Sequence, residues 1–251
     1  KKLRSDKVNY RNEITKCKRI VVKVGTSTLT YDNGNINLSR IEKLTMVLSD
    51  LMNSGKEVVL VTSGAVGVGV NKLKLKEKPQ TIKEKQAVAS VGQCELMHIY
   101  SKFFGQYNHI VGQILLTRDV IEDDHIRENV INTFETLLEK EIIPIVNEND
   151  TVSIDEIANI VRFGDNDNLS AIVAKLVNAD LLVILSDIDG FYDSDPRKNK
   201  NSKLIKVVEC ITPELEQCAG GAGSSLGTGG MATKLTAAKT ATGSGTHMIL
   251  A

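Results

Sequence analysis

The sequence of 251 residues predicts an α/β fold with a largely parallel sheet that carries helices on both faces. Two observations predict this fold class. Short runs rich in β-branched residues recur along the chain, and longer stretches with an apolar residue every three or four positions separate them. The runs expected to form strands are residues 20–24, 58–61, 111–116, 142–146, 181–185 and 248–250.

The stretches between the strands predict helices with recognisable ends. Ser39 and Glu42 form an S-x-x-E capping box ahead of an apolar stripe, and Gly55 stands where that helix should stop. Thr81 and Glu84 repeat the capping box before a second apolar stripe. We therefore expect both stretches to be helices that cover the sheet.

The composition excludes several classes of protein. Thirty-one basic and 31 acidic side chains give a formal net charge of zero, so no global field would recruit nucleic acid or an anionic membrane. No apolar run approaches the roughly 18 residues of a membrane span, and no signal-peptide pattern opens the chain, so a cytoplasmic location is expected. Four scattered cysteines without a C-x-x-C pair, and four dispersed histidines, predict no protein-bound metal.

The ends of the first two strands carry unusual chemistry. Ligands of open α/β sheets bind beyond the carboxyl ends of the strands. Lys23 stands near the end of the first strand, where its burial is costly unless an anion compensates the charge, and Gly25 follows it. Ser63 and Gly64 follow the second strand, where backbone N–H groups could approach an anionic ligand, although a tight turn explains them equally well.

Two polar clusters come later in the chain, at residues 147–150 after the fourth strand and at residues 164–168 before an apolar helix. Either cluster alone is better explained by solvated turns and helix caps. Their coincidence at one edge of the sheet favours a binding site.

A third group of motifs has the character of a phosphate site. Ser186 and Asp187 follow the fifth strand, and the glycine-rich residues 227–230 open a helix that carries Lys234. Unpaired N–H groups and the helix dipole make such a helix start a ready site for phosphate, although glycine content alone would equally suit a flexible linker. The G-x-x-x-x-G-K-[ST] phosphate loop is absent.

Together these motifs resemble those of the amino-acid kinase family over about residues 19–251. The segments that carry the resemblance are V-K-V-G-T-S (22–27), V-T-S-G-A (61–65), G-Q-I-L-L-T (112–117), V-N-E-N-D (146–150), G-D-N-D-N-L-S-A (164–171) and G-T-G-G-M-A-T-K (227–234). The resemblance implies a three-layer sandwich with two lobes. Residues 1–251 would form one such domain, with the amino-acid lobe at about 19–170, the ATP lobe at about 171–251, and no PUA domain.

The resemblance is strongest to the members that act on glutamate. It implies ATP-dependent phosphorylation of the side-chain carboxylate of L-glutamate, with Mg²⁺ carried by the nucleotide, as the first step of proline synthesis. It also implies a homo-oligomer (a dimer or tetramer), feedback inhibition by proline and hand-over of the product to a glutamyl phosphate reductase. A kinase for another acceptor, or a non-catalytic regulator that binds glutamate or proline, remain the alternatives.

Residue roles also follow from the resemblance. It makes Lys23 and Lys234 the catalytic lysines and Asp167 the carboxylate that organises them. The positions that match glutamate-binding ones are Ser63, Gly64, Asp150 and Asn166. The positions that match ATP-binding ones are Lys23, Gly25, Ser186, Asp187, Thr228, Gly229, Gly230, Met231, Ala232, Thr233 and Lys234.

The chemistry requires such residue types in any case. An ionised carboxylate is its own nucleophile, so the reaction needs no general base. Negative charge builds up on the transferring group and on the departing ADP, so positioning and electrostatic stabilisation must supply the catalysis. Lys23 and Lys234 would flank the phosphoryl group, and Asp150 would pair with the substrate ammonium.

Overall fold

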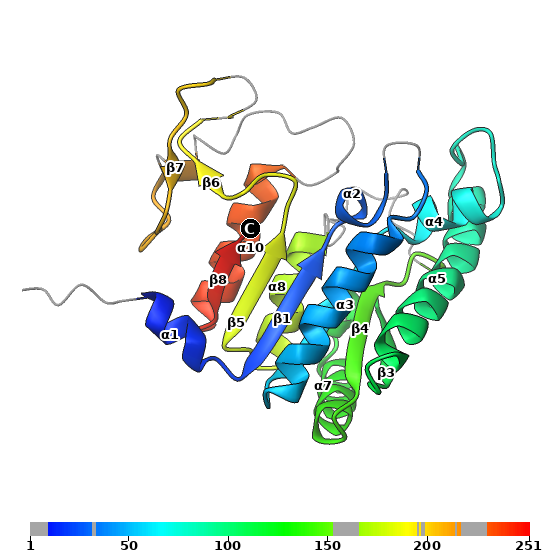
Figure 1. Cartoon of the computed structure of the whole chain (residues 1–251), viewed down its shortest axis with the longest axis horizontal. Coiled ribbons are helices and arrows are strands. Elements are labelled where there is room, and N and C mark those ends of the chain that lie inside the picture. The colour runs from blue at the N-terminus through cyan, green and yellow to red at the C-terminus, as the bar shows by residue number, and fades with distance from the viewer. Residues whose placement is uncertain are drawn as a thin grey trace, which may run out of the picture.

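The structure, a computed structural model, is built around a six-stranded sheet in which every pairing is parallel. It describes residues 10–31, 34–152, 166–194, 196, 199–213, 215–216 and 230–251. The strand order is β3-β4-β2-β1-β5-β8 (Figure 1). The strands are β1 (Arg19–Val24), β2 (Glu57–Val61), β3 (Val111–Leu116), β4 (Ile143–Glu148), β5 (Leu181–Leu185) and β8 (His247–Leu250). All six predicted strands are present, and the predicted fold class is confirmed.

Helices cover both faces of this sheet (Figure 1). On one face, α3 (Leu38–Asn53) and α5 (Ile82–Gly105) bury their apolar stripes against strand residues such as Val22 and Leu60. On the other, α7 (Asp124–Glu139), α8 (Asn166–Leu176) and α10 (Met231–Gly243) pack against the alternate strand residues, such as Val21 and Val59. The short helices are α1 (Tyr10–Lys16), α2 (Thr26–Leu29), α4 (Ala65–Lys72) and α6 (Asp119–Glu122). Successive strand residues point to opposite faces, so two separate cores form.

The predicted ends of the two covering helices differ in outcome. The capping box of Thr81 and Glu84 is confirmed at the start of α5. The box predicted for Ser39 is wrong, because Asn37 caps α3 by accepting a hydrogen bond from the Arg40 N–H at 3.1 Å. Asparagine is as good a cap as serine, and the Asn37 N–H is held by the carbonyl oxygen of Leu29 at 2.8 Å. This tertiary contact starts the helix earlier than the local pattern predicted.

Two glycines let α4 lie directly against α5. A Cβ atom at Gly92 would overlap the carbonyl oxygen of Ala65, and one at Gly69 would overlap that of Val88. Only glycine permits such a close approach of two helix backbones. The contact fixes the start of α4, which directly follows Gly64, against the long helix α5.

A small hairpin of β6 (Phe191–Tyr192) and β7 (Leu204–Ile205) follows β5. Phe191 packs with Leu235 of α10 in a third, minor core. Each strand has only two residues, which is too short to show the alternation of apolar and polar residues that marks a strand, and this hairpin was not predicted.

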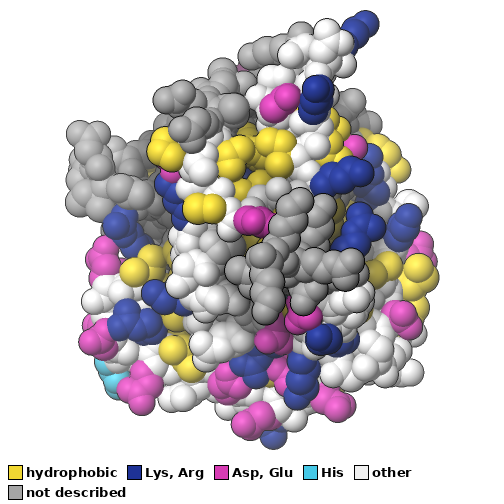
Figure 2. All heavy atoms as spheres, turned by 90° about the vertical axis from the view of Figure 1, so that its left-hand side faces the viewer, with side chains coloured by type: hydrophobic (Ala, Val, Ile, Leu, Met, Phe, Trp, Pro, Cys, Tyr) yellow, Lys and Arg dark blue, Asp and Glu magenta, His cyan; other side chains and the backbone are white. Residues whose placement is uncertain are grey.

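The described surface agrees with the neutral net charge. On the face shown in Figure 2, Lys and Arg side chains are interspersed with Asp and Glu side chains, and hydrophobic side chains gather toward the top. Among the described helices, none is both long enough and apolar enough to span a membrane.

Candidate active site

Two lysines from distant segments meet on one buried carboxylate. Lys23, near the end of β1, places its Nζ 2.6 Å from Asp167 Oδ1, and Lys234, in the first turn of α10, places its Nζ 3.0 Å from Asp167 Oδ2. The side chain of Asp167 lies in the first turn of α8. The whole residue is 0% exposed, and the two lysines are 9% and 8% exposed. The three predicted catalytic residues therefore form one compact cluster.

The cluster carries one net positive charge in a place where water is scarce. Burial acts to raise the pKa of the Asp167 carboxyl, but the nearby Lys23 and Lys234 ammonium groups outweigh it and hold that pKa below its ordinary value. Each ammonium has three N–H donors, so a contact to one carboxylate oxygen leaves capacity for a further anion. The cluster suits a ligand that brings negative charge.

The start of α10 adds backbone donors beside this cluster. Gly230 precedes the helix in an extended conformation, and no described side chain caps the first turn. The Thr233 hydroxyl lies 3.2 Å from Asp167 Oδ2 and 2.7 Å from the carbonyl oxygen of Gly230, and can donate to one of them at a time. Met231 and Ala232 share this first turn. An N-terminus of this kind that includes a lysine is an anion-binding arrangement.

Gly25 lies next to Lys23 at the carboxyl edge of the sheet. It precedes α2 with φ −89°, a conformation open to any residue, and a Cβ atom there would lie 3.6 Å from Lys23 Nζ. Ser186 and Asp187 follow β5, the strand beside β1, and the Ser186 hydroxyl donates to Asp187 Oδ1 at 3.2 Å. These three predicted nucleotide-binding residues thus share one edge with Lys23. Thr228 and Gly229 lie outside the described residues.

The turn after β2 is tied to the turn after β1. The Ser63 hydroxyl donates to the carbonyl oxygen of Val24 at 3.3 Å, and the Thr26 hydroxyl donates to Ser63 Oγ at 3.3 Å. Gly64 adopts φ +100°, and a Cβ atom there would come within 3.3 Å of Thr26 Oγ1. A side chain at this position would therefore be both strained and crowded.

Asn166 links the end of β2 to the end of β4. Its Nδ2 donates to the carbonyl oxygen of Thr62 at 2.5 Å and to Asn147 Oδ1 at 3.0 Å. Asp150 is half-buried and follows β4 by two residues. The predicted acceptor-site residues thus lie along the same sheet edge as Lys23, on the side of β2 and β4.

Sequence reasoning placed Asn147 in the polar cluster of residues 147–150, and Thr26 and Thr62 in motif segments, without giving any of them an individual role. It missed Gln93 altogether. Gln93 lies among the buried positions of α5, where nothing in the local sequence marks it as different from a surface glutamine.

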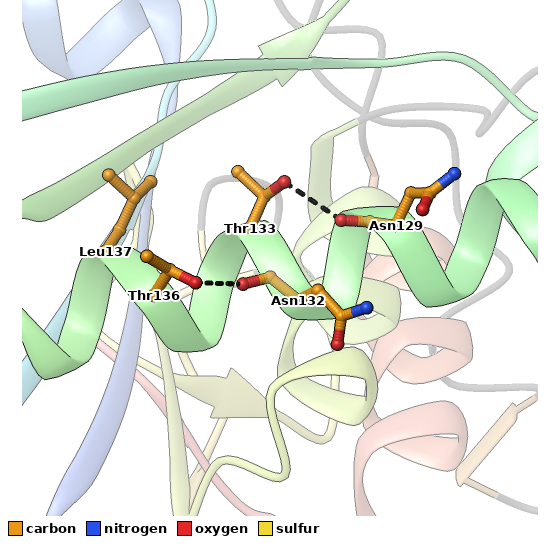
Figure 3. A pocket seen from close by; sticks show the side chains of 5 residues that line it. All are labelled: Asn129, Asn132, Thr133, Thr136 and Leu137. Atoms are coloured by element: carbon orange, nitrogen blue, oxygen red, sulfur yellow. Dashed lines mark hydrogen bonds between the residues drawn. The ribbon is translucent and has the colours of Figure 1, made fainter.

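A hollow of about 440 Å³ lies elsewhere, along α7. Figure 3 shows the side chains that line it; two of its threonines donate back to carbonyl oxygens of the same helix. The lining residues are Asn129, Asn132, Thr133, Thr136 and Leu137. None of them is charged, so this hollow has no counterpart of the two ammonium groups that meet on Asp167.

Comparisons with known proteins identify the family. The model of the amino acid kinase family matches residues 18–251. The chain belongs to that family. Over 241 residues it is 71% identical to the glutamate 5-kinase of Clostridium perfringens, covering 96% of this chain and 90% of that protein. The glutamate 5-kinase of Listeria innocua is 61% identical over 240 residues, covering 96% of this chain and 87% of that protein.

Solved structures support the fold. Carbamate kinase from Giardia lamblia bound to AMP-PNP matches with a TM-score of 0.65 at 16% identity, covering 93% of this chain and 91% of that one. UMP kinase from Ureaplasma parvum matches with a TM-score of 0.59 at 17% identity, covering 93% of this chain and 88% of that one. At such identities the likeness concerns the architecture alone.

Proposed function

We propose that this chain transfers the γ-phosphoryl group of ATP to the side-chain carboxylate of L-glutamate, giving γ-glutamyl phosphate and ADP. The observation that carries the proposal is the pair of buried ammonium groups that Asp167 holds together from β1 and α10. Relatives named glutamate 5-kinase, identical at 61–71% of the aligned positions, support glutamate as the acceptor. The product would feed proline synthesis.

In the transfer, a glutamate carboxylate oxygen forms a bond to the γ-phosphorus while the bond from that phosphorus to the departing ADP oxygen breaks. The nucleophile is already ionised, so no side chain needs to remove a proton. Lys23 and Lys234 would contact the oxygens on which negative charge builds up, in a buried setting where such contacts are strong. Asp167 would set the positions of both lysines and keep them from repelling each other.

The nucleotide would bind with its phosphates at the start of α10. The first-turn N–H groups of Met231, Ala232 and Thr233 and the ammonium of Lys234 supply donors there, and Gly25 leaves room beside Lys23. Mg²⁺ would be carried by the phosphate oxygens and would neutralise part of their charge. Within the described part of the chain, no three His, Cys, Asp or Glu side chains gather as metal ligands.

The acceptor would bind on the side of β2 and β4. Ser63 and the backbone at Gly64 would contact a carboxylate, and Asp150 would pair with the ammonium. This division makes about residues 19–170 the amino-acid lobe and about 171–251 the ATP lobe. Inhibition by proline, a homo-oligomer, hand-over to glutamyl phosphate reductase and a cytoplasmic location stay predictions.

The test is hydroxamate formation by the purified chain with ATP, Mg²⁺, glutamate and hydroxylamine. Lys234→Met should lower the rate by about a hundredfold or more, as loss of one transition-state donor does, while calorimetry still detects glutamate binding. Lys239→Met is the matched control, because Lys239 lies on the same helix and its side chain is 53% exposed. Absence of hydroxamate from the wild type, or a Lys234→Met rate near the wild-type one, contradicts the proposal.

The alternatives are separated by the same preparation. Turnover of N-acetylglutamate, aspartate, carbamate or a nucleoside monophosphate in preference to glutamate would identify another acceptor. Binding of glutamate or proline without any turnover would identify a regulator.

A further inference from the structure

Three amide side chains form a hydrogen-bonded chain from the inside of α5 to the start of α8. Asn166 Nδ2 donates to Asn147 Oδ1 at 3.0 Å, and Asn147 Nδ2 donates to Gln93 Oε1 at 2.9 Å. Asn147 is 2% exposed and Gln93 is 7% exposed. Asn166 is a predicted glutamate-binding residue, whereas Gln93 lies in the core beneath it.

Two backbone groups fix the direction of this chain. The Glu148 N–H can only donate, and it lies 2.9 Å from the atom of Asn147 that must therefore be the oxygen. The carbonyl of Thr62 can only accept, and it lies 2.5 Å from the atom of Asn166 that must therefore be the nitrogen. With Asn147 oriented in this way, its nitrogen faces Gln93, which must present its oxygen.

This direction decides what Asn166 can offer a ligand. Both N–H donors of its amide are engaged, by Thr62 and by Asn147, so toward a ligand the amide can only accept a hydrogen bond. An accepting carbonyl oxygen suits an ammonium group and disfavours a carboxylate. Asn166 is thus set to recognise the amino group of an amino acid.

Gln93 is the last, buried member of this series of hydrogen-bonded amides. Among the described residues, its side chain makes one hydrogen bond, to Asn147, and its own Nε2 is buried without a partner. A buried unpaired N–H group is costly, so packing alone would be better served by an apolar side chain. What the glutamine oxygen adds is an acceptor that holds the Asn147 amide in place.

We propose that Gln93 is a positioning residue which, through Asn147, holds Asn166 with its carbonyl oxygen toward the amino group of the acceptor. The proposal rests on glutamate being the acceptor, as argued above. Removing the Gln93 oxygen leaves Asn147 Nδ2 as a buried donor with no acceptor, which is costly when the amide stays where it is. Asn147 then reorients, and Asn166 loses one of the two contacts that fix it.

The experiment compares Gln93→Leu with Gln93→Glu. Leucine has a similar size and no acceptor, so the KM for glutamate and the calorimetric Kd for glutamate should rise about tenfold, while kcat and the KM for ATP stay within about twofold. The Kd for glutarate, which lacks the amino group, should not change. A glutamate side chain at this position retains an accepting oxygen, and burial without a described cation beside it holds its carboxyl in the neutral, protonated form, so Gln93→Glu should restore both constants to within about twofold of the wild-type values.

The matched control is Phe104→Leu, on the same helix and 0% exposed, which loses core packing about three helical turns away from Gln93. Its melting temperature should fall while its Kd for glutamate stays unchanged. If Gln93→Leu does not fold, Gln93→Met replaces it as an unbranched side chain of similar length.

Two results would overturn the proposal. One is an unchanged Kd for glutamate in the folded Gln93→Leu or Gln93→Met variant. The other is equal weakening of glutamate and glutarate, which would mean a general loss of structure. The calorimetric measurements need no turnover, so they separate this proposal from the proposed kinase activity, which fails on its own if the wild type forms no hydroxamate.

Discussion

Replacement of Asp167 by asparagine is the most informative single change in this protein. The asparagine side chain would keep the shape of the aspartate but remove the charge that Lys23 and Lys234 share. Removal of one member of a buried ion pair costs about 3–5 kcal/mol, because the remaining charge stays buried and uncompensated. Here two ammonium groups would remain, each on a residue less than one-tenth exposed, so solvent offers little relief.

The expected effect on the melting temperature follows from chain size. For domains of 150–250 residues, 1 kcal/mol corresponds to about 2–4 °C, so Asp167→Asn should melt about 6–20 °C below the wild type. Asp50→Asn, on the exposed side of α3, is the control and should melt within about 2 °C of it.

Adding ATP to the melting experiment provides a second test. ATP brings the negative charge that Asp167→Asn lacks, so saturating ATP should raise the melting temperature of the variant by more than that of the wild type. The reasoning is refuted if Asp167→Asn melts no lower than Asp50→Asn, or if ATP stabilises the variant less than it stabilises the wild type.

Three further outcomes are expected. Although burial acts to raise the pKa of Asp167, the two lysines hold that pKa below its unfolded value, so the stability that the ionised carboxylate contributes is complete above about pH 4 and is lost below. The difference in melting temperature between the wild type and Asp167→Asn should therefore be constant near neutral pH and disappear in acid. A difference that persists in acid would contradict this. Gly25→Ala should keep the wild-type melting temperature, since the φ of Gly25 is −89°, but it should raise the KM for ATP, because the added methyl group lies 3.6 Å from Lys23 Nζ. If steady-state kinetics show an unchanged KM for ATP, Gly25 is not part of the nucleotide site. Gly92→Ala should lower the free energy of unfolding by about 1–3 kcal/mol, because the added methyl group would overlap the carbonyl oxygen of Ala65. A loss of less than about 0.5 kcal/mol in urea titration would argue against the close contact between α4 and α5.

The sequence predicted the sheet well because each strand is a compact apolar run. Lys23 was informative for the opposite reason, since a charge inside such a run needs a partner. The structure supplies that partner as Asp167, from a helix far along the chain, together with a second lysine. The resemblance to the family had grouped these three residues, but composition and periodicity could not show that they touch.

Other features depended on contacts that no local pattern records. Asn37 replaces Ser39 as the cap of α3 because the backbone of Leu29 holds it. The hairpin of β6 and β7 is too short to show a period. Gln93 looks like any helix glutamine until the fold places Asn147 against it.

The most direct measurement of the central claim is a structure with glutamate, ADP and aluminium fluoride, which imitates the phosphoryl group in transfer. The account expects Nζ of Lys23 and Nζ of Lys234 each within ~3 Å of a fluoride, a hydrogen-bond distance, with a glutamate side-chain oxygen in line. A complex in which either ammonium lies more than ~6 Å from the fluoride, beyond any direct contact, would contradict it.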